Sequence, residues 1–264
     1  MSNPHKILLV QAGVASNRYP FRSHPLGLMI LAACARRTNP DIDVRILDMK
    51  VEKSTPDSIA AMVAGRGYGI VGVGGFSVHA DIMESVARAV KEAAPDTLLV
   101  AGGPHPSCHP EKILRAAPFD IAVAGQGESV FADIVRRRIH NEDVYHVDGI
   151  SFVRKREYVR NNPALALEPD SLPMPAWDLV DIASYARVSS FSILGRRRYM
   201  SLFTSRGCPF HCIYCHRIFG KTFRPKSAAR VVGEIRELSE KYGIRDFDIL
   251  DDVFNLDRAR VHAI

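Results

Sequence analysis

The chain has 264 residues, of which 47% are hydrophobic and 24% charged, and its formal net charge is +6 at pH 7. This composition is typical of a globular protein with one large domain or two ordinary ones, and five unevenly placed cysteines exclude a disulfide scaffold. No segment approaches the roughly 18 unbroken apolar residues of a membrane span, and no signal peptide is recognisable at the start, so a cytoplasmic protein is expected.

The first half of the sequence alternates short apolar runs with amphipathic stretches, and each apolar run ends in glycine or small polar residues. This pattern predicts a wound α/β sheet of five parallel strands and five helices. The expected strands are 6–12, 44–49, 68–76, 97–103 and 121–126. In such a sheet the ligand binds at the carboxyl ends of the strands, so the glycine-rich loops that follow them are the candidate binding loops.

The following segments differ in character from the first half. Residues 141–195 contain an expected hairpin and then several prolines, which predicts a connector. After it the sequence predicts a strand that leads into a cysteine-rich loop, a helix with Ser227 as its N-cap, and another strand, "FDILDD". The arginine triplets at 136–138 and 196–198 have no interleaved aromatic residues, so we interpret them as solvated faces and expect no nucleic-acid binding.

The loop "RGCPFHCIYCHR" holds Cys208, Cys212 and Cys215 between the predicted strand and helix. Thiolates are soft ligands that suit zinc, copper(I) or an iron–sulfur cluster, and His211 or His216 could complete a zinc tetrahedron. Three cysteines on one tight loop can instead hold three irons of a cubane cluster and leave the fourth iron open for an exogenous ligand. Cys34 and Cys108 have no second thiol at such spacing and are expected to be unremarkable.

The C-x3-C-x2-C spacing, with the aromatic Tyr214 before the third cysteine and a strand before the first, resembles that of radical S-adenosylmethionine (SAM) enzymes. The resemblance implies that Cys208, Cys212 and Cys215 ligate a 4Fe-4S cluster, that SAM chelates the open iron, and that Tyr214 lies near the adenine. It also implies reductive cleavage of SAM to a 5'-deoxyadenosyl radical, with an electron donor such as flavodoxin or ferredoxin as partner. The protein's part would be to position the cofactors, exclude water and tune the cluster.

The first half and its connector are similar to the cobalamin-binding, Rossmann-like (flavodoxin-like) domain that precedes the radical SAM barrel in one large subclass. The segments that carry this resemblance include "GIVGVGGFSVHAD", "VAGGPHPSCHP", "DIAVAGQGES" and "LPMPAWDLVD". The cobalamin contacts that it implies are Gly74, Gly75, Ser77, Gly102, Gly103, Pro104, His105, Gly125, Gly127 and Glu128. The D-x-H-x-x-G motif, whose histidine ligates cobalt in other cobalamin domains, is absent, and His24 and His105 are only weak candidates for that role.

The predicted strand "FDILDD" resembles the second barrel strand of the same subclass, which makes Asp251 and Asp252 candidate contacts for the SAM amino group. Both residues also have a plain interpretation as loop or capping acids. The sequence thus predicts a cobalamin domain at 1–140, a linker at 141–195 and the beginning of a radical SAM (β/α) barrel, an incomplete one, at 196–264.

Three functions are compatible with this organisation. The first is a cobalamin-dependent radical SAM enzyme, or a fragment of one, that acts on an unknown small molecule by methyl transfer to an unactivated carbon or by ring formation. The second is a non-catalytic module that holds cobalamin and a cluster, because the barrel is incomplete. The third is a zinc-stabilised interaction module.

Overall fold

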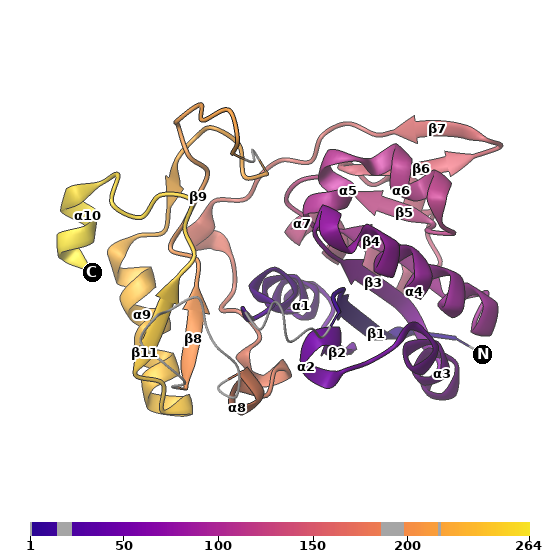
Figure 1. Ribbon diagram of the computed structural model, residues 1–264, viewed down its shortest axis with the longest axis horizontal. Coiled ribbons are helices and arrows are strands. Elements are labelled where there is room, and N and C mark those ends of the chain that lie inside the picture. The colour runs from indigo at the N-terminus through magenta and orange to yellow at the C-terminus, as the bar shows by residue number, and fades with distance from the viewer. Residues whose placement is uncertain (1, 15–22, 186–197, 216–217) are drawn as a thin grey trace.

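A seven-stranded sheet forms the N-terminal part of the protein in the computed structural model, which describes residues 2–14, 23–185, 198–215 and 218–264 (Figure 1). Its strands are β1 (Asn3–Gln11), β2 (Asp43–Asp48), β3 (Tyr68–Gly74), β4 (Leu98–Gly102), β5 (Ile121–Val123), β6 (Ile150–Arg154) and β7 (Glu157–Arg160), in the order β2-β1-β3-β4-β5-β6-β7. Strands β1 to β5 are parallel and follow the predicted flavodoxin-like order. The winding direction reverses between β1 and β3.

The prediction of a five-stranded sheet was wrong, because the hairpin of the connector extends the sheet. Strand β6 pairs antiparallel with β5, and β7 pairs antiparallel with β6. The hairpin itself was predicted, but its attachment was not. A connector can join a sheet wherever the last strand offers an unpaired edge, and the short strand β5 does so here.

Helices cover both faces of the sheet because its parallel strands are apolar on both sides; every residue of β3, for example, is buried. On one face lie α1 (Leu26–Thr38) and α7 (Glu128–Ile139), and on the other lie α3 (Pro56–Arg66), α4 (Ala80–Ala93) and α6 (Pro110–Ala116). The short helices α2 (Met49–Glu52) and α5 (Pro104–Cys108) directly follow β2 and β4. Two large hydrophobic clusters, one on each face, form most of the core, and Ile30, Cys34 and Leu172 form a small third one.

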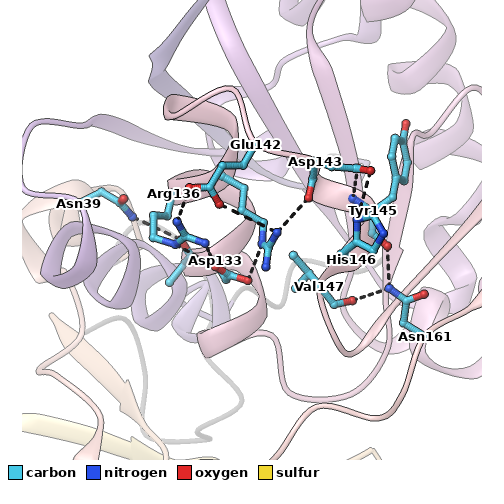
Figure 2. A network of polar contacts seen from close by, with 11 residues as sticks. Asn39, Asp133, Arg136, Glu142, Asp143, Tyr145, His146, Val147 and Asn161 are labelled. Atoms are coloured by element: carbon cyan, nitrogen blue, oxygen red, sulfur yellow. Dashed lines mark hydrogen bonds and ion pairs between the residues drawn. The ribbon is translucent and has the colours of Figure 1, made fainter.

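A polar network fixes the chain between α7 and the hairpin (Figure 2). Arg136 pairs with Asp133 and Glu142, each at 2.9 Å, and Asn161 donates to the carbonyl oxygens of Tyr145 and Val147. The arginine triplet at 136–138 therefore makes contacts within the protein: Arg137 also pairs with Asp133, and Arg138 donates to the carbonyl oxygen of Asp96. Arg136 and Arg137 thus stabilise the turn after α7, and Arg138 connects α7 to the turn before β4.

The C-terminal part adds a second, smaller layer against the α1/α7 face. It comprises α8 (Ile182–Tyr185), β8 (Tyr199–Leu202), β9 (Ser205–Arg206), β10 (Arg224–Pro225), α9 (Ala228–Tyr242), β11 (Asp246–Ile249) and α10 (Arg258–Ala263). Strands β8 and β11 are parallel and are connected through α9, which is one strand–helix–strand unit. Met200 and Leu202 of β8 and Leu238 of α9 belong to the same hydrophobic cluster as α1 and α7, so the two layers share a core.

Local signals explain the ends of α9. The hydroxyl of Ser227 accepts a hydrogen bond from the backbone N–H of Arg230, as predicted for an N-cap, and Gly243 ends the helix in the left-handed conformation. Strand β11 ends at Ile249, so Asp251 and Asp252 lie just beyond it. Across the described residues, no helix is both long enough and apolar enough to cross a membrane.

Candidate functional site

A cleft of about 490 Å³ lies at the carboxyl ends of β1, β3, β4 and β5, where the wound sheet predicts a ligand. Most of the predicted cobalamin contacts line it: Gly74, Gly75, Gly102, Gly103, Pro104, Gly125, Gly127 and Glu128. Apolar side chains such as Leu28, Leu31 and Phe131 form its floor. The cleft therefore combines apolar walls with a backbone-rich rim, as suits a large ligand with a flat apolar face and polar edges.

Gly103 shows why glycine is required at this rim. Its φ of +87° and ψ of −166° fall in a region that is essentially restricted to glycine. A Cβ at this position would also lie 3.2 Å from the backbone nitrogen of Gly75 and 3.3 Å from its carbonyl oxygen. The turns after β3 and β4 are thus packed backbone to backbone, which keeps the cleft open above them.

Ser77 and His105, which were predicted to contact the ligand, do not line the cleft. The Nδ1 atom of His105 lies 3.1 Å from the Ser77 hydroxyl, and the ring is buried beside His109. Burial, together with the positive charge that His109 can carry, lowers the pKa of His105. The pair joins η1 (Ser77–His79) to α5 behind the glycine loops. Ser77 and His105 therefore support these loops and do not face the cleft.

The opposite wall of the cleft comes from the C-terminal layer, which the sequence did not indicate. Phe203 and Arg206 reach it from the segment β8–β9, Ile218 and Phe219 from the cysteine loop, and Leu250 and Asp252 from the end of β11. The rings of Phe203 and Phe219 meet edge to face, with centroids 5.8 Å apart. A ligand in the cleft would therefore contact the glycine loops on one side and residues that flank the cysteine loop on the other. Cys208, Cys212 and Cys215 themselves do not line the cleft.

A buried ion pair connects these two walls. A guanidinium nitrogen of Arg206 lies 2.6 Å from the carboxylate of Glu128, and the two side chains are 7% and 8% exposed. The second terminal nitrogen of Arg206 donates to the side-chain oxygen of Gln126 at 3.2 Å. Glu128, predicted as a cobalamin contact, lines the cleft, and its carboxylate pairs with Arg206 of the opposite wall.

His24 lies at a corner of the cleft in a cluster of buried polar groups. Its Nδ1 accepts from the backbone N–H of Ser201 at 3.3 Å, which leaves the ring proton on Nε2. The ring stacks on Tyr185 with centroids 4.3 Å apart, and the Tyr185 hydroxyl donates to Asp48 at 3.0 Å. This cluster joins β2, α8 and β8. Burial lowers the pKa of His24 to about 4, and burial beside Asp48 raises the pKa of Tyr185 well above its usual value.

We expect His24 to make the protein sensitive to acid between pH 6.5 and pH 4. The unfolded chain protonates this histidine below its usual pKa of 6.5, whereas the folded protein binds the proton only near pH 4. The unfolded state then binds more protons, so stability falls as the pH falls through this window, by up to about 3 kcal/mol. The free energy of unfolding, measured in urea at several pH values, should depend less steeply on pH in His24→Gln than in the original chain. His146→Gln, at an exposed position, should keep the original pH dependence. An unchanged pH dependence of the unfolding free energy in His24→Gln would show that His24 does not cause the acid sensitivity.

The cysteine loop leaves and returns through a short antiparallel pair, in which Arg206 of β9 faces Arg224 of β10. Gly207, directly before Cys208, has φ +80°, and a Cβ there would lie 2.3 Å from the carbonyl oxygen of Thr222. Cys215 N–H donates to the carbonyl oxygen of Cys212 at 3.2 Å, which turns the loop between the last two cysteines. The base of the loop is thus tightly constrained.

All five cysteines, each within the described residues, are free thiols, and Cys212 and Cys215 are exposed while Cys208 is half-buried. The described part of the chain gathers no set of three or more histidine, cysteine, aspartate or glutamate side chains that could hold a metal ion. His211 is exposed, and His216 lies outside the described residues. The donor types on the loop fit an iron–sulfur cluster, but the loop must close around it, because metal binding and local folding are coupled.

The structure separates the two candidate aspartates. The carboxylate of Asp251 accepts from the backbone N–H of Thr204 at 2.6 Å and from the hydroxyls of Thr204 and Ser205, so it fixes the turn between β8 and β9. Asp252 instead lines the cleft. Tyr214 is 89% exposed on the cysteine loop and does not line the cleft.

Comparison with known proteins finds a family match in the N-terminal half. Residues 14–135 match the profile of the B12 binding domain. The chain is 33% identical to an uncharacterised methyltransferase of Pyrococcus horikoshii, over 89% of this chain and 50% of that protein. It is 29% identical to the cobalamin-dependent radical SAM methyltransferase TokK of Streptomyces tokunonensis, over 92% of this chain and 35% of that protein. Its fold is similar to that of the radical SAM methyltransferase TsrM of Kitasatospora setae with cobalamin and a [4Fe-4S] cluster bound (TM-score 0.70, 21% identity, 100% of this chain and 50% of that one).

Residues 14–135 are thus similar to the B12 binding domain, and the mixed α/β fold is similar to that of a radical SAM methyltransferase. The chain itself is a homologue of the cobalamin-dependent radical SAM methyltransferases. It spans half or less of the length of the relatives described above.

Proposed function

We propose that this chain is the corrinoid-binding and cluster-binding part of a cobalamin-dependent radical SAM enzyme of the methyltransferase type. The observation that carries the proposal is the cleft, whose walls are the glycine loops of the B12 binding domain on one side and residues flanking the three cysteines on the other. In this proposal the corrinoid lies against the first wall, and the cluster forms in the cysteine loop beside the second. Two cofactors that act on one substrate must lie close together, and the shared cleft supplies that proximity.

Each part of the cleft has a distinct task in this proposal. Gly74, Gly103 and Gly125 admit the corrinoid to close backbone contact, and Cys208, Cys212 and Cys215 hold the cluster. Asp252 is the candidate contact for SAM, because it faces the cleft. When bound, the cluster and SAM supply a 5'-deoxyadenosyl radical, and the corrinoid supplies a transferable methyl group. The apolar lining of the cleft keeps water from the reacting groups.

The corrinoid itself is expected to have no histidine ligand from His24. The Nε2 atom of His24 carries the proton, and Nδ1 is engaged with Ser201, so neither nitrogen offers a lone pair to cobalt. The electron donor is expected to be a small redox protein such as flavodoxin or ferredoxin. The substrate is a small molecule that reacts by methyl transfer, with ring formation as the alternative outcome.

A corrinoid-binding measurement tests the proposal. The purified chain, mixed with hydroxocobalamin, should retain about one corrinoid per chain in equilibrium dialysis. Gly103→Ala should weaken the affinity by about tenfold or more, because a side chain in this backbone conformation costs about 1–3 kcal/mol and pushes the two glycine turns apart.

The matched control is Gly65→Ala. Gly65 lies in α3, where an added Cβ meets nothing within 4 Å, so this variant should bind as the original chain does. Failure of the original chain to retain any corrinoid would refute the cobalamin part of the proposal. Equal affinities of the Gly103→Ala and Gly65→Ala variants would refute the placement of the corrinoid over the turn after β4.

A further inference from the structure

The contact between Arg206 and Glu128 joins the two walls of the cleft at the base of the cysteine loop. Arg206 ends β9 and stands directly before Gly207 and Cys208, so its backbone is the base of the cysteine loop. Glu128 is the first residue of α7, directly after the loop that follows β5 of the B12 binding domain. The contact therefore spans 78 positions of sequence and connects the two candidate cofactor sites.

The guanidinium of Arg206 contacts two partners, one through each terminal nitrogen. One terminal nitrogen of Arg206 binds the Glu128 carboxylate at 2.6 Å, and the other binds the Gln126 oxygen at 3.2 Å. Gln126 lies in the loop before α7 and Glu128 begins this helix, so a single guanidinium fixes the junction between loop and helix in position and orientation. A lysine ammonium could pair with the carboxylate but could not reproduce both bonds.

The guanidinium also organises the far side of the cysteine loop. Its carbon lies 5.5 Å from the ring centroid of Phe219, which is in the range of a cation–π contact. The carbonyl oxygen of Phe219 lies 3.1 Å from the place of a Cβ on Gly207. Arg206, the last residue of β9, therefore also contacts Phe219 on the far side of the three cysteines, and Phe219 lines the cleft.

We infer that the Arg206–Glu128 pair is a positioning contact that seats the cysteine loop on the B12 binding domain and thereby couples the two cofactor sites. The inference rests on the proposed function and adds its regulation: occupancy of the glycine-rich wall stabilises the seated loop, and a cluster in the loop stabilises the glycine-rich wall. Such coupling is reciprocal in binding free energy. Cluster loading should therefore raise the affinity for corrinoid, and corrinoid should favour cluster loading.

The first test uses the chain without cofactors. In hydrogen–deuterium exchange, Glu128→Gln should speed the exchange of amides in 207–223 by about tenfold or more, while β1, β3 and β4 exchange as before. Arg206→Lys should give an intermediate effect, because it keeps the charge and cannot make both bonds. Asp133→Asn is the control, since Asp133 lies on the same helix and pairs near the surface with Arg136 and Arg137. Unchanged exchange in the loop of both Glu128→Gln and Arg206→Lys would overturn the inference.

The second test measures the coupling. Corrinoid affinity is determined with and without the reconstituted cluster, and the ratio should be about fivefold or more in the original chain and in Asp133→Asn. In Glu128→Gln and Arg206→Lys the ratio should fall towards one, although each ligand still binds alone. If the pair only stabilised the fold, its loss would weaken the corrinoid affinity by the same factor with and without the cluster. The ratio would then be unchanged, and that result would overturn the inference.

The two proposals fail separately. If the original chain binds corrinoid and cluster but the ratio is one, the coupling is refuted and the proposed function stands. If it binds neither cofactor, the proposed function is refuted, and the exchange measurement still decides whether Arg206 and Glu128 seat the loop. Thermal unfolding of each variant shows whether a change is confined to the loop.

Discussion

Replacement of Cys208, Cys212 or Cys215 by alanine is expected to abolish cluster assembly after anaerobic reconstitution with iron and sulfide. The original chain should bind about four irons and about four sulfides and show the broad visible absorbance of a 4Fe-4S cluster. Loss of one thiolate from a site with three protein ligands leaves too few to hold the cubane. Iron content and absorbance of each variant should therefore fall nearly to background.

Cys108→Ala is the matched control for this experiment. Cys108 is an exposed free thiol at the end of α5 and is not part of the cysteine loop, so its loss should leave iron binding intact. Stoichiometric zinc with no iron–sulfur absorbance would refute the cluster and favour the zinc-stabilised module. A cluster that forms without cleavage of SAM to 5'-deoxyadenosine would instead favour the non-catalytic module.

Removal of the Glu234 carboxylate is expected to cause the largest loss of stability. Glu234 is buried in α9, with its carboxylate 2.7 Å from the ammonium of Lys226 and 2.9 Å from the guanidinium of Arg230. Glu234→Ala leaves these two cations facing each other without their anion. Breaking a buried ion pair in this way costs about 3–5 kcal/mol, measurable as the free energy of unfolding in urea.

The loss should depend on pH in a defined direction. Burial already lowers the pKa of Lys226 below 10.5, and loss of Glu234 lowers it further. As the pH rises towards 10.5, folded Lys226 releases its proton before the unfolded chain does, so the unfolded state binds more protons and the variant regains stability. A variant whose deficit stays constant up to pH 10.5 would contradict this account.

Glu237→Ala provides the control on the same helix. Glu237 pairs with Lys241 at 3.0 Å on the solvent side, where such pairs contribute about 0–1 kcal/mol. Its loss should therefore be small and nearly independent of pH. Equal losses in the Glu234 and Glu237 variants would show that the buried cluster does not stabilise the C-terminal layer.

The arrangement of the sheet could be predicted because it depends on local patterns. The continuous apolar runs of β1, β3 and β4 require burial on both faces, and the helices between them have periodic apolar faces, so parallel pairing follows. The crevice at the carboxyl ends follows from that pairing. The attachment of β6 to β5 could not be predicted, because an antiparallel hairpin of the same sequence is equally consistent with a separate connector.

The candidate site was predictable only where residues act through type and spacing. The glycine turns fall in this class and line the cleft, whereas Arg206, Phe203 and Phe219 reach the cleft through tertiary packing. The metal-binding role of the three cysteines stays a prediction. Glu234 did leave a signal, since it stands at helical spacing between the apolar Val231 and Leu238, and an acid inside an apolar face needs cationic partners. The partner Lys226 lies outside the helix, so the sequence pattern could not supply it.

The two walls of the cleft are synthesised at different times, because they lie far apart along the chain. The glycine loops are complete once Glu128 has been synthesised, whereas the wall that carries Phe203, Arg206 and Phe219 follows at least 75 residues later. Domains fold largely as units and from the N-terminus during synthesis. The glycine loops of the nascent protein are therefore exposed on one side until the second wall is made, and under the proposed function a corrinoid could bind to them at that stage.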